Sequence, residues 1–143
     1  MEKKTKSEID REKRIAQRRN ARDVAFKLVF EYTFNKEENR DMIEEYAIGL
    51  HKDDVAYINE VYFGVISHYD DLIEKIKENA QNFAFDRIFK VDLALLLLAL
   101  YEIIYMKSIP YKVSVDEALT LAEKYSTDKS SNYINGILAK FSR

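Results

Sequence analysis

Residues 91–106 read VDLALLLLALYEIIYM, the longest apolar stretch of the chain. At about 100° per residue, its leucines point to every side of a helix; they are Leu93, Leu95, Leu96, Leu97, Leu98 and Leu100. A helix that is apolar all round packs against several others, so we expect this segment to be the central helix of the fold, with Asp86 as its N-cap. It falls short of the roughly 20 residues that a membrane span needs, and we expect no membrane association.

The composition narrows the fold class. The chain has 143 residues, 47% of them hydrophobic, with one proline, three glycines and no cysteine. This length suggests one domain. Without cysteine, disulfide scaffolds, zinc ribbons, iron–sulfur proteins and thiol enzymes are excluded, and a reducing, cytoplasmic location fits. So few turn residues argue against an all-β fold, and the helix-favouring content predicts an all-α domain.

Apolar residues recur at helical spacing on both sides of the central segment. Pro110 ends the central helix, and Ser114 and Glu117 form an expected capping box for the next one. The other amphipathic stretches are 20–34, 41–48, 53–68, 70–80 and 131–141. Gly49 is expected to close the second of these, and Gly136 suggests a close helix–helix approach in the last one. The total is about seven helices with short connections.

The charge is distributed unevenly. The formal net charge of −2 combines +5 in residues 1–22 with −7 in the rest of the chain. We expect a basic, flexible arm over residues 1–17 and one helical domain over 18–143, with no signal peptide because the first residues lack an apolar run. A basic arm on an acidic body is common in proteins that bind nucleic acid, although a solvated, disordered tail fits the charge equally well.

One face of the first helix is not explained by its apolar stripe. Arg19, Arg22 and Phe26 share this face, and Phe30 lies one turn further on. Arginines neutralise phosphates and aromatic rings stack on unpaired bases, so the face predicts binding of single-stranded RNA. The alternative is a helix packed on both sides, with the two rings in the core. Tyr133 is expected at the edge of the core, beside the apolar stripe of the last helix.

No catalytic pattern is present. The two histidines, His51 and His68, match no metal-ligand spacing, and the scattered glycines exclude a phosphate-binding loop. His51 beside Asp53 and Asp54 is a possible metal site, but a solvated loop fits better. No nucleophile–base pair can be named. The sequence therefore predicts a non-catalytic binding protein without cofactor or metal.

Four motifs between residues 18 and 141 resemble those of the transcription antitermination factor NusB family. The stretch RRNARDVA at 18–25 is similar to the arginine-rich opening of the family's first helix, and VDLA at 91–94 with LALYE at 98–102 is similar to its central helix. IPYKV at 109–113, leading into DEA at 116–118, matches the PYKVxxxEA junction, the most specific motif of the set. YINGIL at 133–138 matches the FVNGVL signature of the last helix.

The resemblance implies two packed antiparallel helix bundles and a role in the transcription elongation complex. Family members bind the boxA element of nascent ribosomal RNA together with a small-subunit ribosomal protein that acts as NusE. The RNA-binding residues expected from the face and the resemblance together are Arg14, Arg18, Arg19, Arg22, Phe26 and Phe30. The resemblance also implies a surface shared by RNA and protein partner at Phe30, Asp92 and Tyr133.

Three positions depart from the family pattern. Phe30 stands where tyrosine is usual, so a hydroxyl contact is lost while stacking is retained. Leu97 replaces a common arginine, which bears on a buried ion pair or a subunit contact, and Lys129 replaces an acidic residue, which bears on a partner contact. The alternative function is a homodimeric interaction module with the same fold and little RNA binding.

Overall fold

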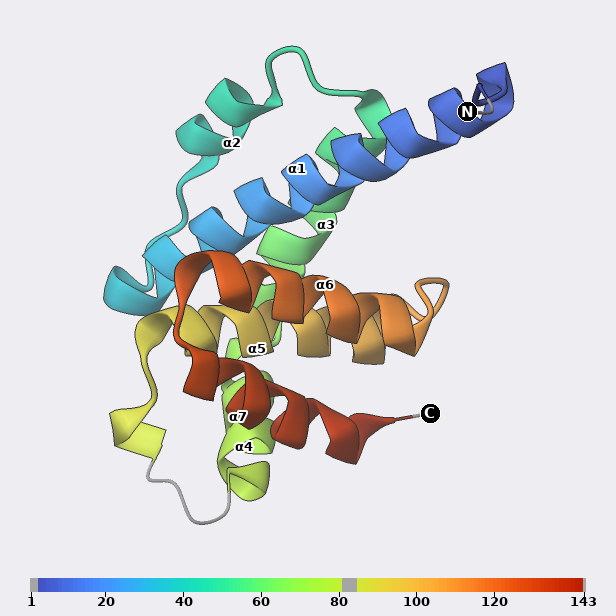
Figure 1. Ribbon diagram of the computed structural model, residues 1–143. Helices are drawn as coiled ribbons and strands as arrows, with labels where there is room; N and C mark the ends of the chain where they lie inside the picture. The colour runs from blue at the N-terminus through green and yellow to red at the C-terminus, as the bar shows by residue number, and fades with distance from the viewer. Residues whose placement is uncertain (1–2, 81–84, 143) are drawn as a thin grey trace.

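The computed structural model describes residues 3–80 and 85–142, and this part of the chain is built from helices without a strand (Figure 1). The α-helices are α1 (Lys6–Asn35), α2 (Arg40–Ala47), α3 (Lys52–Ser67), α4 (Tyr69–Asn79), α5 (Lys90–Tyr105), α6 (Tyr111–Tyr125) and α7 (Asp128–Leu138). Short 3₁₀ turns lie at Phe85–Arg87 (η1) and Ala139–Phe141 (η2). The predicted all-α fold with about seven helices is confirmed.

Helix α5 is the centre of the molecule, as its sequence predicts. Every residue from 92 to 103 is buried, and α1, α3, α4, α6 and α7 all pack on it. Two of these buried residues are carboxylates, Asp92 and Glu102. The expected N-cap is wrong: Asp86 lies in η1, and Phe89 occupies the cap position without a capping side-chain hydrogen bond. Among the described residues, no helix is both long enough and apolar enough to cross a membrane.

The helices form two groups that share α5. In one group, α5, α6 and α7 follow one another in antiparallel directions (Figure 1). The other group contains α1, α2, α3 and α4. In it, α1 lies antiparallel to α5 because Arg22 meets Glu102 near one end of α5 while Lys90 meets Thr33 near the other. Within this group α1 and α3 run in the same direction, with α2 in the connection between them.

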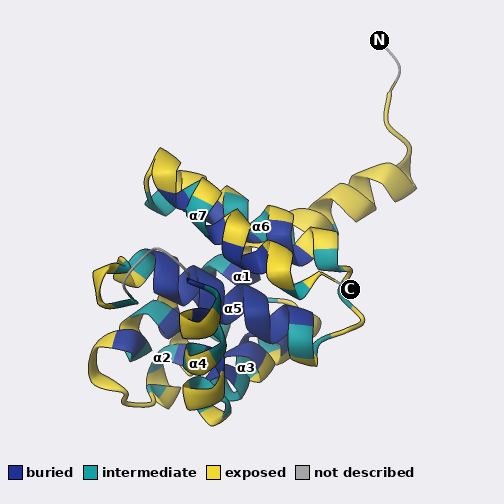
Figure 2. Ribbon diagram, turned by 90° about the horizontal axis from the view of Figure 1, so that it is seen from below, coloured by how far each residue is buried: buried dark blue, intermediate teal, exposed yellow. Residues whose placement is uncertain are grey.

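Helix α1 begins much earlier than the periodicity predicts. It starts at Lys6, behind a cap in which the Thr5 hydroxyl accepts a hydrogen bond from the Glu8 amide at 3.1 Å. The apolar stripe begins only at Ala21, so the earlier turns have no hydrophobic signal. The turns before Arg14 project beyond the body of the fold and are exposed (Figure 2), whereas Arg14 and Arg18 are half-buried beside α3. The basic segment is therefore helical from Lys6 and continuous with the rest of α1, and the expected boundary at residue 18 falls inside this helix.

The capping box expected at the start of α6 is wrong. The helix begins at Tyr111, directly after Pro110, so Ser114 and Glu117 lie inside it. Both side chains reach across to other helices. The Ser114 hydroxyl donates to Glu102 on α5 at 2.9 Å, and Glu117 pairs with Arg19 on α1. A proline suits this position because its φ is pre-set and the first helical turn needs no amide donor from it.

The close helix–helix approach occurs at a different glycine from the expected one. A Cβ added to Gly136 would meet nothing within 4 Å, whereas a Cβ on Gly64 of α3 would lie 2.1 Å from the Tyr101 ring of α5. The prediction for Gly136 is therefore wrong, and Gly64 is the residue that lets α3 and α5 meet. Gly49 follows α2 with a φ of 81°, the left-handed conformation expected where the chain leaves a helix.

Candidate nucleic-acid interface

Arg22 is a buried structural residue. Its guanidinium donates to both oxygens of Glu102, from Nε at 2.9 Å and from Nη2 at 3.1 Å, and both side chains are almost fully buried. The Tyr57 hydroxyl donates to the same carboxylate, as does Ser114. One anion thus joins α1, α3, α5 and α6, and its buried lone pairs are satisfied, as the interior requires.

This network also fixes the charge state of its members. Burial raises the pKa of Tyr57 well above its usual value, and the negative charge of Glu102 adds to this effect. Burial alone would lower the pKa of Arg22, but its contacts with Tyr57 and Glu102 outweigh it and raise the pKa. Tyr57 therefore remains a neutral donor and Arg22 a cation. A charge held in this way is not available to a phosphate at the surface.

Arg14 and Arg18 both reach one carboxylate on α3. Arg14 Nη1 lies 3.0 Å from Asp54 Oδ2 and Arg18 Nε lies 2.8 Å from Asp54 Oδ1, and Asp54 is buried. Burial would raise the pKa of Asp54, but the hydrogen bonds from Arg14 and Arg18 outweigh it and lower the pKa. The Arg18 guanidinium also lies over the Tyr57 ring, 4.8 Å from its centroid. These contacts tie the middle of α1 to α3.

Arg19 reaches the other neighbour of α1, helix α6. Its Nε lies 3.0 Å from Glu117 Oε1. Further along the same side, Asp23 pairs with Lys124 of α6 at 3.1 Å and with Lys27 at 3.8 Å, and both lysines are exposed. The sequence analysis missed Lys27, although its spacing of eight residues from Arg19 places it on nearly the same side of α1. Lys124 could not be predicted in this way, because it joins this surface only through the packing of α6.

The two phenylalanines of the predicted face have different positions. Phe26 is buried, with its ring stacked on Tyr125 at 5.1 Å between centroids, so the expected exposed face is wrong for Phe26 as it is for Arg22. Helix α6 covers this part of α1, which the sequence of α1 alone does not reveal. Phe30 is half-buried and holds the exposed Phe34 ring edge-on at 5.0 Å. The structure therefore keeps Phe30 at the surface and moves Phe26 into the core.

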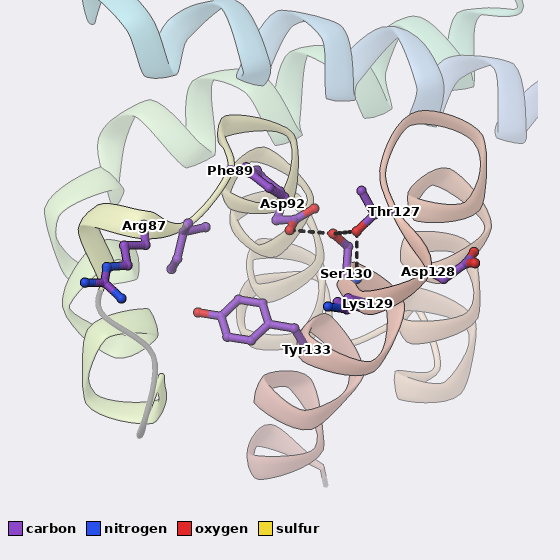
Figure 3. Close-up of a pocket in the computed structure, with 9 residues that line it drawn as sticks. Arg87, Phe89, Asp92, Thr127, Asp128, Lys129, Ser130 and Tyr133 are labelled. Atoms are coloured by element: carbon purple, nitrogen blue, oxygen red, sulfur yellow. Dashed lines mark hydrogen bonds between the residues drawn. The ribbon is translucent and has the colours of Figure 1, made fainter.

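Asp92 and Tyr133 line one cavity of about 510 Å³ between η1, the start of α5 and α7 (Figure 3). The Asp92 carboxylate accepts hydrogen bonds from Ser126 at 2.6 Å and Ser130 at 2.8 Å, which fixes the N-terminus of α7. The Tyr133 ring extends from α7 across the cavity, half-buried as expected for the edge of the core (Figure 3). Burial, with the nearby charge of Asp92, raises the pKa of Tyr133.

Two exposed cationic side chains line this cavity, Arg87 of η1 and Lys129 of α7. Phe89 also lines it, with a largely exposed ring. Lys129 replaces an acid of the family pattern, so this rim carries more positive charge than the resemblance implies. Phe30 is not among the residues that line the cavity.

The described residues contain no cluster of three or more His, Asp or Glu side chains able to hold a metal ion. His51, weighed as a metal candidate, caps α3 instead: its Nδ1 accepts a hydrogen bond from the Asp53 amide at 3.1 Å. Asp54, its other possible partner, is bound to Arg14 and Arg18.

Comparison with known proteins identifies the family. The sequence profile of the NusB family matches residues 19–143. The transcription antitermination protein NusB of Clostridium novyi is 39% identical over 125 residues, covering 85% of this chain and 94% of that protein. The crystallised NusB of T. maritima superimposes with a TM-score of 0.80 at 28% identity, covering 87% of this chain and 89% of that one.

A third likeness concerns the fold alone. A structure of the antitermination factors NusB and NusE in complex with double-stranded RNA matches with a TM-score of 0.77 at 22% identity, covering 88% of this chain and 96% of that one. The family profile spans all seven α-helices apart from the first turns of α1, and it includes the α5–α6 junction and the α7 signature. From this profile and the 39% identical relative, the chain belongs to the NusB family.

Proposed function

We propose that the protein is a non-catalytic transcription antitermination factor of the cytoplasm. In this role it binds boxA-like single-stranded RNA of nascent ribosomal transcripts, together with the ribosomal protein NusE, in the transcription elongation complex. Family membership supports this role, and the antitermination factors NusB and NusE have been crystallised with double-stranded RNA in a structure that contains a chain of the same fold.

The observation that carries the proposal is the row of arginines along α1. Although they are paired, Arg14, Arg18 and Arg19 keep 38%, 32% and 58% of their side-chain surface exposed. A phosphate can approach such groups from the solvent side, because a guanidinium has five donors and the carboxylates use only some of them. Arg22 and Phe26 support this row from inside the fold. The surface cations Lys27 and Lys124 continue it toward Phe30.

The carboxylates of Asp54 and Glu117 reduce the positive charge of this arginine row. Asp54 is shared by Arg14 and Arg18, so this cluster keeps a net positive charge, and Glu117 neutralises Arg19. When RNA binds, each of these arginines either leaves its carboxylate for a phosphate or contacts both at once. The net gain per arginine is smaller than for an unpaired one, so the affinity depends on several contacts acting together, and salt weakens it.

The test is a salt titration of RNA affinity. We expect Arg18→Ala/Arg19→Ala to bind a boxA-like single strand more weakly, with the slope of log K against log salt reduced by about 0.7 for each lost phosphate contact. Lys75→Ala is the matched control, because it removes a partly exposed cation that is likewise paired with a carboxylate, Asp71 of α4. An affinity and slope equal to those of the wild type in the double variant would contradict the proposal.

A homodimeric interaction module with little RNA binding is the second candidate. The pairing of all four arginines with carboxylates favours it, because no guanidinium of the set is held ready for phosphate alone. Light scattering at several protein concentrations, with and without RNA, separates the two functions. A mass that doubles with concentration and does not respond to RNA would favour the module.

A further inference from the structure

Two large aromatic rings are exposed where α1 ends and α5 begins. Phe34 and Phe89 each keep 60% of their surface accessible, although they come from distant parts of the chain. Lys90 links the two segments: it follows Phe89 in sequence, its ammonium donates to the Thr33 carbonyl at 3.3 Å, and it lies 5.8 Å from the centre of the Phe34 ring. We call Phe34, Phe89 and Lys90 the aromatic corner.

We propose that the aromatic corner is a stacking platform for unpaired bases of the bound RNA. The inference rests on the proposed function and extends it to residues outside both the arginine row and the family motifs. Aromatic rings beside a cation are typical of surfaces that bind single strands, because every base has a face that stacks and each is linked to a phosphate.

The position of the corner agrees with a strand that follows α1. Phe34 lies fifteen residues after Arg19, which is about 22 Å along the helix and within about 60° around it. Phe30 lies between them on the same side, and the exposed amines of Lys27 and Lys124 lie between Arg19 and Phe30. A strand that contacts Arg19 and continues along this side reaches the aromatic corner.

The corner is suited to a base by its rigidity and charge. The Phe34 ring is held edge-on by Phe30, whose own ring is 6.0 Å from the buried Phe26, so little side-chain freedom is lost when a base stacks on it. Among the described residues, the Lys90 ammonium has no carboxylate partner. An apolar protein partner would have to bury this charge without compensation, whereas the phosphate of a stacked nucleotide neutralises it.

A site-specific reporter is available because the chain contains no tryptophan. Phe34→Trp places a single indole at the corner, and a base stacked on it quenches its fluorescence. The probe is a boxA-like single strand of about 12 nucleotides, within the range that single-strand binding folds cover. Ile48→Trp is the matched control, since Ile48 is 82% exposed in the α2–α3 connection, outside the proposed path. We expect quenching at position 34 and none at position 48.

Affinity measurements complete the test. Phe34→Ala/Phe89→Ala is expected to weaken binding of the same RNA at least about fivefold, the lower end for one stacked base. Phe34→Leu keeps an apolar side chain but has no π face, so it should lose as much RNA affinity as Phe34→Ala. An RNA that lacks the bases at the positions that quench the indole should bind the wild type and Phe34→Ala/Phe89→Ala with equal affinity.

The outcomes separate this inference from the proposed function. Suppose that Arg18→Ala/Arg19→Ala weakens RNA binding, but RNA does not quench the indole at position 34 and Phe34→Ala/Phe89→Ala binds RNA as tightly as the wild type. This result would overturn the stacking platform and leave the proposed function standing. An indole that responds only to purified NusE would also overturn it and assign the corner to a protein partner. If the wild type binds no RNA at any salt concentration, both the proposed function and this inference fail.

Discussion

Arg22 and Glu102 form a buried, two-pronged ion pair between α1 and α5, with donor–acceptor distances of 2.9 and 3.1 Å. The arginine belongs to the motif that suggests RNA binding, and the glutamate interrupts the most apolar helix of the chain. Their pairing explains both features. An arginine-rich motif can thus combine surface cations, such as Arg19, with one that holds the fold together.

Arg22→Ala is expected to lower the free energy of unfolding by about 3–5 kcal/mol, because it leaves Glu102 buried without its counter-ion. Arg19→Ala, which removes a more exposed pair, should cost less than about 1 kcal/mol. Urea unfolding followed by circular dichroism measures both. Equal losses in the two variants would show that Arg22 is no more structural than Arg19.

Asp54→Asn is expected to release Arg14 and Arg18 and to raise the affinity for single-stranded RNA, while lowering stability by about 1–3 kcal/mol through the lost charged hydrogen bonds. Fluorescence polarisation at fixed salt measures the affinity, and urea unfolding measures the stability. Asp71→Asn on α4 is the control, since it frees Lys75 away from α1. A weaker affinity in Asp54→Asn would mean that Asp54 positions the arginines for RNA rather than competing with it.

The two helical glycines predict substitutions of opposite sign. Gly64→Ala should destabilise the protein by about 1–3 kcal/mol, because its Cβ would overlap the packed Tyr101 ring. Gly136→Ala should stabilise it by about 0.5–1 kcal/mol, because the new methyl group meets nothing within 4 Å and alanine favours a helix. Thermal unfolding of both variants tests this pair. A melting temperature that falls for Gly136→Ala would indicate a contact that the structure lacks.

Tyr101 predicts a loss of stability in alkali. Burial, followed by the negative charge of Glu60 and a hydrogen bond to it, raises the pKa of Tyr101 to about 12. Below pH 10, the folded and unfolded states both keep the phenol proton. Above it the unfolded state releases the proton while the folded state retains it, so stability falls as pH rises toward 12.

The measurement is urea unfolding of the wild type and Tyr101→Phe at pH 9 and pH 11. Between these values the wild type should lose about 1 kcal/mol more than the variant, which has no phenol to titrate. Parallel losses in the two proteins would show that Tyr101 titrates normally in the folded state.

The sequence predicts the helical fold well because the strongest signals are local. The apolar run of α5, the proline before α6 and the spacing of α3 and α4 place these helices within a few residues of their observed bounds. The first turns of α1 are the main exception, since they have no apolar stripe to read. The capping residues are also misassigned, because Ser114 and Glu117 resemble a cap but serve contacts between helices.

The site is less predictable, because exposure depends on which helix covers which face. The helical wheel of α1 places Phe26 and Phe30 on one side but does not show that α6 covers only Phe26. Phe34, four residues after Phe30, was within reach of the same wheel. Phe89 and Lys90 were not, since only the antiparallel packing of α1 on α5 brings Lys90, and with it the start of α5, to Phe34. Asp54 likewise becomes a partner of Arg14 and Arg18 only through the packing of α3.

The most direct test of RNA binding along α1 is an NMR titration of the folded protein with a boxA-like single strand, observing the arginine Nε–Hε signals and the backbone amides. The account predicts shifts at Arg14, Arg18 and Arg19 that continue to Phe30, while the buried Arg22 signal moves little. Shifts confined to other faces of the molecule, with the α1 arginines unchanged at saturating RNA, would contradict it.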